Sequence, residues 1–148
     1  MKYIYIVMII LLIALTACSQ TTNGSNSYSP DGSDVITTQT FQDGELLLSV
    51  GPIAGSSASG NLVVEISSVP QNTNQVLIFL KPKNMPATDN PFTAPNTIVQ
   101  FLEPLSSTIT LDTQSVANGE YELTVGASPQ SGGSGWLGEI KVDFTISN

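Results

Sequence analysis

The stretches that decide the fold are SVANGEYELTV at residues 115–125 and GEIKVDFTIS at residues 138–147. In both, apolar side chains alternate with polar ones, which is the period of a strand that buries one face. As an antiparallel hairpin, the two strands turn one apolar set toward a common core and point their charged side chains outward. The inward set is Tyr121, Leu123, Val125, Ile140, Val142, Phe144 and Ile146.

The chain from Val35 onward continues in the same manner, as short β-branched or alternating runs between clusters of Gly, Pro, Asn and Asp. No window carries an apolar stripe at helical spacing, so we expect an all-β domain. Asp43-Gly44 predicts a tight hairpin turn, and the four prolines in residues 81–96 predict a long connection rather than a strand. The predicted strands are 35–41, 45–50, 61–68, 75–80, 97–102, 107–111, 120–125 and 139–146.

The two deciding stretches resemble the final hairpin of bacterial immunoglobulin-like and fibronectin-type-III-like domains. In that hairpin a turn Gly is followed two places on by Tyr, and the last strand ends in a pattern similar to Phe-Thr-Ile. The resemblance implies an immunoglobulin-like antiparallel β-sandwich of about seven to eight strands over residues 35–148. It also implies a tyrosine corner, in which the hydroxyl of Tyr121 bonds to the backbone near Asn118 or upstream of it. The chain has no cysteine pair and no tryptophan in a central strand, which excludes an antibody-type core and leaves a transthyretin-like sandwich open.

The N-terminus has the parts of an export signal. Met1-Lys2 precedes an apolar run of 13 residues, Tyr3–Leu15, which is shorter than the roughly 20 residues that span a bilayer. Leu15-Thr16-Ala17-Cys18 resembles the lipobox of bacterial lipoproteins, which implies a signal peptide over 1–17 and a lipid on Cys18. The alternative is an uncleaved anchor in which Cys18 is incidental.

Lipidation would attach the mature chain to a membrane through acyl chains on Cys18. Residues 18–34 are polar apart from Tyr28 and predict a flexible tether ahead of the domain. We therefore expect an exported, membrane-anchored lipoprotein. In a Gram-negative host, Ser19 after the lipidated cysteine resembles the signal for the outer membrane.

The composition excludes several kinds of chemistry. The 148 residues contain no His, no Arg, four Lys and twelve acidic residues, for a net charge of −8. Nucleic-acid binding is not expected, because it needs basic side chains to neutralise phosphates. Serine-histidine catalysis and imidazole metal sites are impossible without His. The pair Glu120 and Glu122 fits a solvated strand face better than a hydrolase, and the scattered aspartates lack a calcium-loop spacing. We expect no enzyme activity, cofactor or metal.

Two aromatic residues are the candidate binding residues. Trp136 stands among four glycines in residues 131–138, and Phe92 lies in the proline-rich segment. Each could contact a ligand or pack locally; we favour local packing for Phe92 and a plug over the open end of the sandwich for Trp136. The sequence therefore predicts a non-catalytic structural, adhesive or assembly module with an envelope partner. The alternative is a glycan- or small-molecule-binding lipoprotein that uses these loop aromatics.

Overall fold

The computed structural model describes residues 23–24, 36–102, 107–131 and 135–148. In this part of the chain there are ten strands, two of them only two residues long, and one short 3-10 helix. The prediction of an all-β fold is confirmed, and the eight longer strands correspond to the eight predicted ones. The elements are β1 Asn23–Gly24, β2 Ile36–Asp43, β3 Leu46–Ala54, β4 Ser57–Ala58, β5 Asn61–Ser68, β6 Gln75–Pro82, β7 Ile98–Leu102, β8 Thr108–Asp112, η2 Thr113–Ser115, β9 Gly119–Ser128 and β10 Gly138–Ile146.

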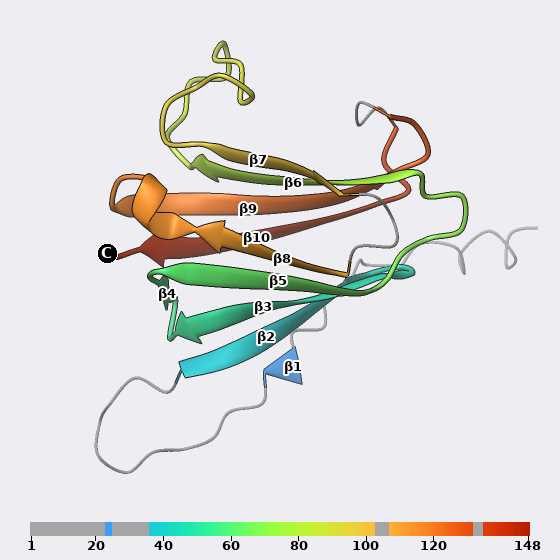
Figure 1. Cartoon of the computed structure of the whole chain (residues 1–148), viewed down its shortest axis with the longest axis horizontal. Coiled ribbons are helices and arrows are strands. Elements are labelled where there is room, and N and C mark those ends of the chain that lie inside the picture. The colour runs from blue at the N-terminus through green and yellow to red at the C-terminus, as the bar shows by residue number, and fades with distance from the viewer. Residues whose placement is uncertain (1–22, 25–35, 103–106, 132–134) are drawn as a thin grey trace, which may run out of the picture.

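The strands join in one sheet that is nearly closed on itself. Its order is β1-β2-β3-β4-β10-β9-β6-β7, with β5 paired to both β3 and β8. The described pairings are antiparallel except for the short parallel contact between β4 and β10. Figure 1 shows that β2, β3, β5 and β8 form one layer, and that β6, β7, β9 and β10 form a second layer facing it.

A single apolar core fills the space between these layers. Alternate residues of the paired strands point into it, because successive side chains of a strand face opposite sides of the sheet. The largest side chains with almost no exposed surface include Leu46, Leu48, Leu62, Ile78, Leu80, Leu111, Leu123 and Ile146.

The predicted β9–β10 hairpin is present, and the predicted face is buried. Tyr121 lies directly opposite Phe144, and the two side chains are only 2% and 4% exposed. The remaining inward-facing residues of both strands are buried as well. The alternation of these two strands therefore predicted their buried face correctly, and their pairing as a hairpin is confirmed.

Three details differ from the expectation. The first hairpin turns at Gly44-Glu45, one residue later than predicted, and of these two only Gly44 has positive φ, at 58°. Strand β6 continues to Pro82 instead of ending at residue 80. A proline lacks the backbone N–H that pairs with a neighbouring strand, but Pro82 is the last residue of β6, so the interior of the strand keeps its hydrogen bonds. The two-residue strands β1 and β4 were not predicted, since two residues are too few to show a periodicity.

Candidate functional site

Exposed aromatic side chains and ion pairs gather on the outward side of the second layer, which consists of β6, β7, β9 and β10. In β6, Val76, Ile78 and Leu80 belong to the core, so Phe79 points to the outer side. Phe101 of the neighbouring strand β7 is 48% exposed. We call the outward surface of β7, β6, β9 and β10, together with Phe92 and Trp136 from two connections, the aromatic face.

Phe92 joins the aromatic face from the long β6–β7 connection. Its ring meets Phe79 edge-on at a centroid distance of 5.3 Å and stacks on Phe101 at 6.1 Å. Asn90 shapes the turn, because its side-chain oxygen accepts a hydrogen bond from the backbone N–H of Phe92 at 3.0 Å. Phe92 nevertheless remains 50% exposed. The favoured interpretation of Phe92, local packing, is therefore confirmed, while the half of the ring that faces solvent leaves contact with a ligand as a prediction.

Trp136 reaches the aromatic face from the connection between β9 and β10. A Cβ added to Gly126 would come within 2.3 Å of the six-membered ring of the indole, so the ring occupies the space above this glycine. Gly126 points outward, because its neighbours Val125 and Ala127 belong to the core. The expectation of a plug over the end of the core is therefore wrong: the indole lies on the outer surface of β9 and is 38% exposed.

A hollow of about 180 Å³ lies between Trp136 and the β6–β7 connection. Phe79 and Thr124 line it from the strands, and Met85 and Pro91 line it from the connection. Lys81, Glu139 and Lys141 complete the lining. The structure thus brings Trp136 and Pro91, the residue before Phe92, to one site, although they are 45 positions apart in the sequence.

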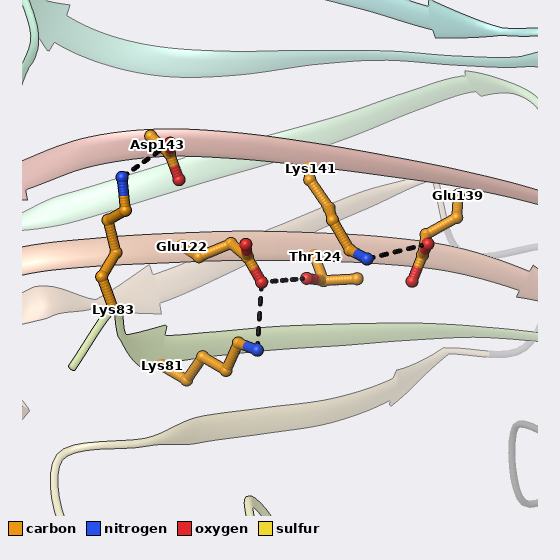
Figure 2. Close-up of polar contacts among 7 residues, drawn as sticks. All are labelled: Lys81, Lys83, Glu122, Thr124, Glu139, Lys141 and Asp143. Atoms are coloured by element: carbon orange, nitrogen blue, oxygen red, sulfur yellow. Dashed lines mark hydrogen bonds and ion pairs between the residues drawn. The ribbon is translucent and has the colours of Figure 1, made fainter. Parts of the chain in front are cut away.

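Three ion pairs lie on the aromatic face (Figure 2). Lys81 contacts Glu122 at 3.1 Å, and Lys141 contacts Glu139 at 3.1 Å. Glu122 also accepts a hydrogen bond of 3.3 Å from the hydroxyl of Thr124. The strand register creates the first of these pairs, because Lys81 is the direct neighbour of Glu122 across β6 and β9.

The third pair joins Lys83 to Asp143 at 2.9 Å, beyond the end of β6. The hydrogen bond and the charge of Asp143 raise the pKa of the Lys83 ammonium group. Three of the four lysines of the chain therefore lie on this face, each beside a carboxylate. Exposed pairs of this kind contribute little stability, but they place both hydrogen-bond donors and acceptors beside the aromatic rings.

Sequence reasoning missed most of this surface. Of its residues, it singled out Trp136 and Phe92 as binding candidates, and Glu122 only as part of a solvated strand face. The outward position of Phe79 in an apolar strand, and that of Phe101 in the next one, were the signals that could have extended the site. The pairing of Lys81 with Glu122 could not be predicted, because it depends on β6 and β9 being neighbours.

The other candidate residues have structural roles. The hydroxyl of Tyr121 donates a 2.8 Å hydrogen bond to the carbonyl oxygen of Ala117, upstream of Asn118 as expected, and burial raises the pKa of this tyrosine. Asp43 accepts a bond of 2.9 Å from the backbone of Glu139. Asp112 accepts a bond of 3.0 Å from the backbone of Gln114 at the start of η2. Among the described residues, no three acidic side chains gather as metal ligands.

Cys18 and the rest of the predicted signal and tether lie outside the described residues, except Asn23–Gly24, which form β1 and pair with β2 rather than belonging to a wholly flexible tether. In the part of the chain that is described, no helix has the length and apolar character needed to cross a membrane. Comparison with protein-family models, with curated proteins and with solved structures finds no match to this chain.

Proposed function

We propose that this chain is a lipid-anchored protein of the bacterial cell envelope whose β-domain is a non-catalytic contact module. The sequence at residues 15–18, placed at the end of a short apolar run, supports the lipid anchor. The absence of histidine from the sequence and the use of its single cysteine for the lipid support a role without catalysis.

The strand order supports an immunoglobulin-like sandwich for this domain. Strands β3, β5 and β8 pair as the A, B and E strands of such a fold do, and β6, β9 and β10 pair as C, F and G do. The bond from Tyr121 to Ala117 corresponds to a tyrosine corner at the start of strand F. These features favour the immunoglobulin-like arrangement over the transthyretin-like one.

The aromatic face is the observation that carries the contact role. Among the described residues, five large apolar side chains are exposed, and three of these, Phe92, Phe101 and Trp136, lie on this face. Exposed aromatic side chains that are already held by neighbours lose little conformational entropy on binding, and aromatic residues are common anchors of interfaces. We infer that the protein meets its envelope partner through this surface.

The test is the size of the native complex formed by the full-length chain in its own cells. Phe101→Ser removes an exposed ring from the aromatic face, and Thr110→Ser changes an exposed residue of β8 in the opposite layer. In mild-detergent extracts we expect wild type and Thr110→Ser to migrate in the same large complex, and Phe101→Ser to migrate alone. A complex that survives Phe101→Ser, or one that Thr110→Ser also disrupts, would contradict the proposal.

A further inference from the structure

We propose that the hollow beside Trp136 binds one uncharged pyranose ring of an envelope glycan. This inference rests on the proposed function and names the ligand class of the same face. The proposed ligand is a sugar whose ring substituents are equatorial, as in glucose and N-acetylglucosamine. Three properties of the hollow support this assignment: the arrangement of its apolar walls, the balance of its charges, and its size and position on the sheet.

The apolar walls suit the face of a sugar ring. Its apolar lining comes from three segments: Phe79 from β6, Met85 and Pro91 from the β6–β7 connection, and Trp136 from the β9–β10 connection. A pyranose with equatorial substituents presents a flat face of weakly positive axial C–H groups, which are attracted to the negative face of an aromatic ring. Trp136 is seated on Gly126 before any ligand arrives, so little ordering is needed on binding.

The polar groups suit hydroxyls better than charged groups. Lys141 with Glu139, and Lys81 with Glu122, place a donor-only ammonium beside an acceptor-only carboxylate (Figure 2). A hydroxyl can donate to the carboxylate and accept from the ammonium at the same time, so it can join either pair without separating the charges. An anionic or cationic ligand would be repelled by one member of each pair. Glu122 does not line the hollow, but it pairs with Lys81 and so offsets the charge of the second lysine; the favoured ligand is therefore neutral.

The size and position of the hollow argue against a protein segment as its occupant. Its volume of about 180 Å³ is smaller than the clefts that bury drug-sized ligands. It lies on the outer surface of β6, β9 and β10, where β6 and β9 already pair with strands on both sides and the lining residues of β10 lie opposite β9. An extended peptide therefore cannot add there as a further strand, since that mode of binding requires a free sheet edge. A single ring of a longer glycan fits both constraints.

Trp136 provides the measurement, because it is the only tryptophan of the chain and its fluorescence reports on this hollow alone. We would titrate the full-length protein, held in a detergent without a sugar headgroup, with cellohexaose and with chitohexaose. At least one of them should shift the emission of Trp136 saturably, with half-saturation at or below about 1 mM. Lys141→Met should weaken this binding about tenfold or more, because it removes a charged hydrogen-bonding partner.

Lys83→Met is the matched control, since Lys83 forms an ion pair on the same face but does not line the hollow. It should leave the half-saturation concentration within about twofold of wild type, and thermal melts of each variant verify that it is folded. If neither oligosaccharide changes the emission up to about 10 mM, or if Lys83→Met weakens binding as much as Lys141→Met, the inference is overturned. The proposed function would still stand in either case, provided that Phe101→Ser disrupts the native complex.

Discussion

Gly126→Ala is the substitution whose outcome follows most directly from the structure. The added Cβ would lie 2.3 Å from the indole of Trp136, where ordinary contact begins at about 3.4 Å. The backbone of β9 is fixed by hydrogen bonds to strands on both sides. We therefore expect the indole to be displaced, while the strand stays in place.

The cost can be estimated from the surface that Trp136 buries. With 38% of its surface exposed, it buries about 150 Å² of a side chain of roughly 250 Å². At about 25 cal/mol per Å², reduced for residual burial in the unfolded chain, this is about 2 to 3 kcal/mol. Alanine in a strand recovers about 0.5 to 1 kcal/mol relative to glycine. The net loss should be about 1 to 2 kcal/mol, which lowers the melting midpoint by roughly 5 to 10 °C.

A double-mutant cycle with Trp136→Ala tests this reasoning. Without the indole, the added Cβ meets no ring, so Gly126→Ala should become neutral or stabilising by about 0.5 to 1 kcal/mol. Denaturant unfolding of the four proteins gives the free energies of unfolding, and in Gly126→Ala the emission of Trp136 should shift to longer wavelength. An equal cost of Gly126→Ala in both backgrounds would show that Trp136 does not pack on this glycine.

Three further substitutions test other parts of the account. Cys18→Ser should abolish acyl labelling and release the chain from the membrane fraction; retained labelling would rule out the lipid anchor. Phe144→Ala should lower the free energy of unfolding by about 3 to 5 kcal/mol, because it opens a cavity in the core opposite Tyr121, and a loss below about 1 kcal/mol would show that the ring is not buried there. Tyr121→Phe should cost about 0.5 to 1.5 kcal/mol, since it leaves the Ala117 carbonyl without its partner; an unchanged unfolding curve would show that this bond does not contribute.

The sequence predicted the strands well because their residues carry the information locally. In β9 and β10 the alternation is unbroken, and the correct register is the one that buries every apolar side chain of both strands. The hydroxyl partner of Tyr121 was also predictable, because it lies only four residues upstream. The turn at Gly44-Glu45 was misplaced by one residue, since Asp43-Gly44 is an equally good turn signal.

The candidate site was only partly predictable because it depends on contacts between distant segments. The prolines of residues 81–96 identify a connection, but they do not show that Phe92 returns to pack on Phe79 and Phe101. Trp136 can take its position because Gly126, ten residues earlier, has no side chain on the outward surface of β9. Neither contact leaves a periodic signal in the sequence, so both the composition of the site and the location of the indole required the structure.

The central claim is that the aromatic face is the contact surface of this protein. It is tested most directly by photo-crosslinking in living cells, with a benzophenone amino acid placed at Phe101 or at Phe92 in the full-length chain. The control position is Thr110, on the opposite layer and also exposed. We expect adducts with an envelope component from both test positions and none from Thr110. Adducts that form from Thr110 alone, or equally from all three positions, would contradict it.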